Sequence, residues 1–99
     1  MMKYTIFMEV ANNIAQHLQI KPKKLFEKNQ ANELVMGRHF LYYICYERGM
    51  KLVDIKKYME KNNHPIAHQT ILYGLKMMEQ HLNDPDLKKI VDKLSKVNV

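Results

Sequence analysis

Three polar residues, His68, Gln69 and Thr70, stand together where an apolar pattern with the period of a helix begins. A helix usually starts on a single Ser, Thr, Asp or Asn, so these larger side chains in one first turn call for another reason. Gln can form two hydrogen bonds with adenine, His can donate to guanine, and the methyl group of Thr can pack on thymine. The pattern is therefore typical of a helix whose first turn reads base edges. The alternative is that the three side chains only bond backbone groups at the start of their own helix.

Other kinds of chemistry find little support in the sequence. His64 and His68 have the spacing of a helical metal pair, but Pro65 interrupts the helix and no Cys or acidic residue lies nearby to complete a site. The chain has no Gly-rich phosphate loop, and Cys45 with a distant histidine does not make a credible nucleophile pair. We therefore expect no catalytic residue, no metal, no cofactor and no enzymatic activity.

The composition is that of one small basic domain. The chain has 99 residues, 46% of them apolar, and a formal net charge of +6. We expect a single domain over residues 1–99. Excess positive charge favours nucleic acid as a partner. No apolar run is long enough for a membrane span, no signal peptide is recognisable, and one cysteine, Cys45, fits a reducing compartment. These features predict a cytoplasmic protein with no membrane partner.

Apolar residues recur with a helical period nearly throughout the chain, so the expected fold class is all-α. The predicted five or six helices span residues 4–19, 22–28, 32–47, 52–59, 66–82 and 84–96. Asn32 and Asp84 are the expected N-caps of the third and sixth helices, with Pro85 at the first helical position of the sixth. Gly49 follows the third helix, where a left-handed residue is needed.

The fourth and fifth predicted helices have the outline of a helix-turn-helix. In that motif the second helix enters the major groove and its N-terminal residues meet base edges, while the first helix crosses the backbone. Here Lys51, Lys56 and Lys57 are available on the first helix for phosphate groups. A plain helical hairpin is the structural alternative.

Three segments of the chain add a resemblance to a known family. They are the pair Arg38-His39, the short helix Leu52-Val53-Asp54-Ile55 and the run Ala67-His68-Gln69-Thr70-Ile71-Leu72-Tyr73-Gly74. In this order, and with IAQHLQIKPKKLF upstream, they resemble the C-terminal duplex-DNA-binding domain of the bacterial replication initiator DnaA, a Trp-repressor-like helix-turn-helix. The resemblance covers residues 10–96 and includes no ATPase segment.

The resemblance implies sequence-specific binding of double-stranded DNA by a free-standing domain that regulates replication or transcription. Base contacts would come from His68, Gln69, Thr70 and Val53. Phosphate contacts would come from Arg38, His39, Lys28, Lys51, Lys56, Lys57 and Lys76.

The chain departs from the family at several of its DNA-contacting positions. Ala67 replaces an acidic residue that reads bases, and Asn29 and Gln30 stand in a loop that is rich in arginine in the family. Lys21, Lys23 and Lys24 are candidates to replace that lost charge if they face the same side. The departures also support an alternative, a DNA-binding fold that has become a protein–protein interaction module. Whether the chain is a monomer or a homodimer is left open by the sequence.

Overall fold

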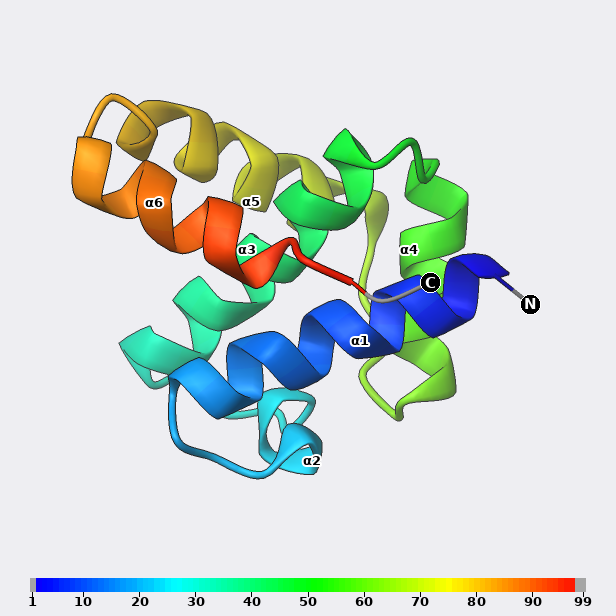
Figure 1. The fold of residues 1–99 in the computed structure, drawn as a ribbon. Coiled ribbons are helices and arrows are strands. Elements are labelled where there is room, and N and C mark those ends of the chain that lie inside the picture. Colours follow the sequence, from blue (N-terminus) through cyan, green and yellow to red (C-terminus); the bar gives the residue numbers. More distant parts are fainter. Residues whose placement is uncertain (1, 98–99) are drawn as a thin grey trace.

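The computed structural model describes residues 2–97, and within them the chain forms α-helices and no strand (Figure 1). The predicted all-α class is therefore confirmed. The helices are α1 (Met2–His17), α2 (Pro22–Leu25), α3 (Asn32–Glu47), α4 (Leu52–Lys61), α5 (His68–His81) and α6 (Pro85–Leu94). The predicted domain, 1–99, also includes Met1 and residues 98–99, which lie outside the described residues.

Helix α3 is the centre of the fold and packs against each of the other five helices (Figure 1). Six consecutive residues of α3, from Gly37 to Tyr42, are all buried, so the helix is covered on nearly every side. A helix that is buried nearly all round lies in the middle of a core. Burial raises the pKa of the Cys45 thiol to about 12, which leaves it protonated and unreactive.

Helix α1 lies across one side of α3 and buries a single stripe. Phe7, Val10, Ala11 and Ile14 follow the helical spacing of three and four residues and have no exposed surface. On its polar side, the Asn13 amide donates to the carbonyls of Leu94 and Lys96 at distances of 3.1 and 2.7 Å. These two bonds hold the end of α6 against α1.

Local sequence signals explain two of the helix ends as predicted. Asp84 is the N-cap of α6, and its carboxylate accepts a hydrogen bond of 2.9 Å from the backbone N–H of Asp86. Pro85 follows at the first helical position. Gly49 has a φ of +95° directly after α3, a conformation that a side chain would strain.

Other helix ends differ from the sequence predictions. The N-cap of α3 is Ala31, one residue before the predicted Asn32, and the Asn29 side chain accepts from its N–H. Helix α1 ends at His17 because Gln19 is left-handed, with a φ of +59°. Helix α2 is also shorter than predicted, ending at Leu25, and α6 ends at Leu94. Helix α5 begins two residues late, at His68.

Candidate nucleic-acid interface

Helices α4 and α5 pack on each other and on α3, and residues 62–67 join them. Asn63 turns the chain with a φ of +63°, and the His64 N–H then donates to the Met59 carbonyl. The His64 imidazole is buried, with Nδ1 2.8 Å from the carbonyl oxygen of Phe26. Because a carbonyl only accepts, Nδ1 carries the proton. The link between the helices is thus fixed to the end of α2.

The first turn of α5 is open to solvent. His68, Gln69 and Thr70 are all exposed, as expected for residues that meet a ligand. The N-cap residue, Ala67, has extended backbone and no side chain that accepts from the helix, and the first turn holds no acidic residue. Backbone N–H groups at this end and the positive end of the helix dipole are therefore available to an anion or to base edges.

A cleft of about 310 Å³ lies beside this turn. We call it the α5 cleft. Its lining comes from the loop after α2, from α3, from the link before α5 and from α5 itself: Lys28, Gln30, Val35, Arg38, His39, Tyr42, His64, Pro65, Ile66 and Thr70. Lys28 and Thr70 therefore flank one depression, so the loop and the start of α5 face the same side of the molecule.

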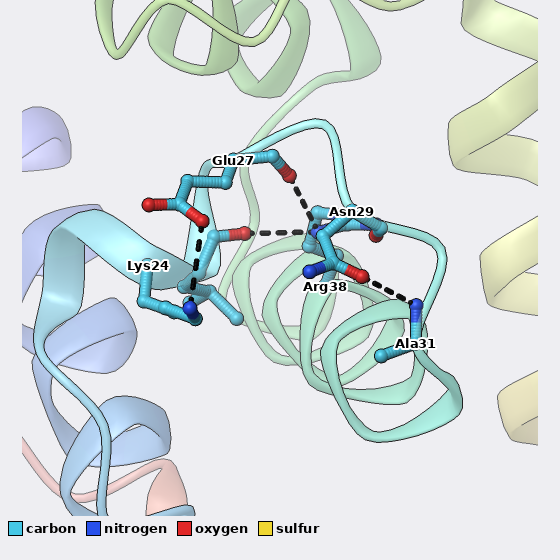
Figure 2. Close-up of polar contacts among 6 residues, drawn as sticks. Lys24, Glu27, Asn29, Ala31 and Arg38 are labelled. Atoms are coloured by element: carbon cyan, nitrogen blue, oxygen red, sulfur yellow. Dashed lines mark hydrogen bonds and ion pairs between the residues drawn. The ribbon is translucent and has the colours of Figure 1, made fainter.

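Arg38 occupies a different environment from the one expected for a phosphate contact or for a solvated surface residue. Its side chain is only 4% exposed. Nη1 donates to the carbonyls of Leu25 and Glu27 at 3.1 and 3.2 Å, and Nη2 donates to the Asn29 carbonyl at 2.8 Å (Figure 2). Leu25 is the last residue of α2, and the other two partners belong to the loop between α2 and α3. The guanidinium therefore holds this loop in place, and its donors face backbone.

His39 is also buried, between α3 and α5. Its ring packs against Tyr42, with centroids 6.2 Å apart, and edge-on against Tyr73, at 5.8 Å. Burial lowers the pKa of His39, and the nearby positive charge of Arg38 lowers it further. A buried, neutral ring that packs against aromatic side chains has a structural role. His39 and Arg38 are therefore no longer candidates for phosphate contacts.

The lysines predicted to contact phosphate remain on the surface. Lys28, Lys51, Lys57 and Lys76 are exposed. Lys56 is partly covered and forms an ion pair with Glu60 at 3.8 Å. Among the predicted base contacts, Val53 is 58% exposed on α4. Only Lys28 and Thr70, of the exposed predicted residues, reach the lining of the α5 cleft.

One carboxylate weakens the positive charge at the start of α4. Asp54 accepts from the Lys51 backbone N–H at 3.2 Å and forms an ion pair with Lys3, also at 3.2 Å. These interactions lower the pKa of Asp54, the backbone hydrogen bond most of all. Asp54 therefore stays ionised near neutral pH and offsets part of the charge of Lys51.

The sequence patterns did not identify two residues that are important for this site. His64 links the α4–α5 connection to α2, and its signal was only a histidine before proline in a turn. Gly74 lets α5 approach α3, because a Cβ there would lie 2.8 Å from Tyr42 and 2.9 Å from His39. A glycine inside a helix costs about 1 kcal/mol relative to alanine, so its presence is a recognisable sign of close packing.

No protein-family model, curated protein sequence or solved structure matches the chain. Within residues 2–97, no three His, Cys, Asp or Glu side chains are grouped so that they could hold a metal ion. In the same part of the chain, the helices are too short or too polar to cross a membrane.

Proposed function

We propose that this chain binds double-stranded DNA through the first turn of α5, with α4 and α5 acting as a helix-turn-helix. The supporting observation is the exposed, uncapped start of α5 beside the α5 cleft, whose lining also includes Lys28. His68, Gln69 and Thr70 would meet base edges in the major groove, with Val53 beside them. The resemblance of the motif residues to the DnaA DNA-binding domain supports a role in replication or transcription control.

Phosphate contacts in this proposal come from exposed lysines alone. Lys28, Lys51, Lys57 and Lys76 are the candidates with the most accessible side chains. Four neutralised phosphates correspond to a slope of about −3.6 in log K against log salt, or about a hundredfold loss of affinity between roughly 50 and 200 mM salt. Arg38 contributes indirectly, because it fixes the loop that carries Lys28.

Fluorescence anisotropy with a random pool of labelled duplexes, at several salt concentrations, tests this proposal. The double variant His68→Ala/Gln69→Ala should weaken binding to the duplex that the wild type selects from this pool by about tenfold or more, since each lost base contact costs about 1–3 kcal/mol. Lys28→Ala should reduce the salt slope by about one. The control is Lys88→Ala, an exposed lysine on α6. Absence of binding even at low salt would refute the proposal.

A second function is favoured by one specific observation. Leu72 and Tyr73 are large apolar residues on α5 that are 49% and 58% exposed. Adjacent exposed apolar side chains can mark a surface for another protein. If Leu72→Ser/Tyr73→Ser abolishes association with a protein partner while the wild type binds no duplex, the fold serves as a protein-interaction module instead.

A further inference from the structure

A second and larger hollow shares Lys28 with the α5 cleft. Its volume is about 550 Å³, within the range of roughly 300–1,000 Å³ that is usual for ligand-binding pockets. We call it the α1–α2 hollow. Its lining comes from α1, from α2 with the loop that follows, and from the end of α4: Met8, Pro22, Lys23, Phe26, Glu27, Lys28, Lys61, Asn62 and Asn63.

Positive charge surrounds this hollow. Lys23, Lys28 and Lys61 come from three different segments, and none has an ion pair within the described residues. The one carboxylate of the lining, Glu27, already pairs with Lys24 at 3.8 Å. The ammonium group of Lys61 lies 4.4 Å from the centre of the Tyr4 ring. Three like charges around one depression repel one another and favour an anionic occupant.

Most of the exposed surface that lines the hollow is apolar. Pro22 and the side chains of Met8 and Phe26 contribute to its lining, and Met8 and Phe26 also belong to the packing around the main core. A phosphate backbone gains little from such a surface, whereas an aliphatic or aromatic side chain gains from leaving water. The preferred ligand therefore combines apolar groups with negative charge.

Both walls of the hollow are held in place before any ligand arrives. On one side, Arg38 and His64 bind the carbonyls of four residues between Leu25 and Asn29. On the other, the Asn62 amide donates to the Tyr58 carbonyl at 2.8 Å and lies 3.7 Å from the Met8 sulfur. A preformed site avoids the entropic cost of ordering itself on binding.

We propose that the α1–α2 hollow binds a short acidic segment of a protein partner, with one or two apolar side chains inside and carboxylates on the surrounding lysines. The ammonium groups are spread over three segments of the chain, so several carboxylates along a peptide complement them better than a single anion does. This site does not depend on the proposed DNA contacts of α5, although Lys28 lines both depressions.

The test uses the full chain and three fluorescein-labelled peptides. They are Asp-Glu-Leu-Phe-Glu-Asp, the neutral Asn-Gln-Leu-Phe-Gln-Asn and the apolar-free Asp-Glu-Ser-Gly-Glu-Asp. The first should bind most tightly by anisotropy. The variant Lys23→Glu/Lys61→Glu should weaken its binding about tenfold or more. The control, Lys88→Glu/Lys89→Glu on α6, has the same net charge and should bind nearly as the wild type does.

A second measurement locates the peptide. With ¹³C-methyl methionine, the Met8 signal should shift on titration, while that of Met78, which is fully buried in the core, should stay. Equal binding of the apolar-free peptide, equal weakening by both lysine pairs, or no Met8 shift would overturn the proposal. A Met8 signal that shifts with a DNA duplex but not with peptide would also overturn the proposal, because the hollow would then belong to a nucleic-acid surface. The duplex test of His68 and Gln69 is read independently of these outcomes.

Discussion

Replacing Arg38 with alanine separates a structural role from a DNA-contacting one. The buried bond from Nη1 to the Leu25 carbonyl would be lost without replacement, at about 1.5–3 kcal/mol for a hydrogen bond to a charged group. The carbonyls of Glu27 and Asn29 are partly buried and can regain water, so each of those bonds contributes less, about 0.5–1 kcal/mol. We expect Arg38→Ala to lower the free energy of unfolding by about 2.5–5 kcal/mol.

Thermal unfolding followed by circular dichroism measures this effect directly. For a domain of this size, a loss of that magnitude lowers Tm by at least about 10 °C. Arg38→Lys should recover only part of the stability, because a single ammonium group cannot match the forked geometry of the guanidinium. The matched control is Arg48→Ala, which removes an exposed arginine whose one bond goes to the Ser95 carbonyl. It should cost less than about 1 kcal/mol.

The opposite result would refute the reasoning. If Arg38→Ala unfolds at the wild-type temperature and its salt slope for duplex binding falls by about one, the guanidinium contacts phosphate in solution. The loop between α2 and α3 would then be held by other means.

Three further predictions concern the same framework. Burial lowers the pKa of His64 below its ordinary value of 6.5, so the imidazole takes up a second proton more readily in the unfolded chain than in the folded one. The stability of the fold therefore falls as pH drops below 6.5. His64→Asn, which keeps a donor near the same carbonyl, should reduce that pH dependence in unfolding curves taken from about pH 7 to about pH 5. Gly74→Ala should destabilise the fold by about 1–2 kcal/mol in urea unfolding, because crowding against Tyr42 outweighs the gain in helix propensity. The control is Gln80→Ala, at an exposed position of the same helix, which should leave stability nearly unchanged. Asp84→Ala should lower the free energy of unfolding by about 1 kcal/mol, because α6 loses its N-cap. Asp84→Asn should keep most of the wild-type stability in the same urea unfolding experiment.

Local chemistry made much of the fold predictable. The spacing of Val10 and Ile14, four residues apart, is typical of one face of an amphipathic helix, and both side chains are buried. The start of α6 was predictable to the residue, because an Asp cap followed by Pro satisfies its first turn without help from elsewhere. The exposure of His68 and Gln69 also followed from their place before the apolar period of α5.

The sequence by itself determined which segments are helical, but only the tertiary structure decided which polar side chains reach solvent. The sequence alone suggested a surface position for Arg38 and only an interrupted metal pair for His64, because nothing adjacent in sequence satisfies their polar groups. Their partners are carbonyls 9 to 38 residues upstream, and these become available only when the end of α2 lies beside α3 and the α4–α5 link. A buried donor is tolerated only where such an acceptor is within reach. That condition belongs to the arrangement of the helices, and no local pattern encodes it.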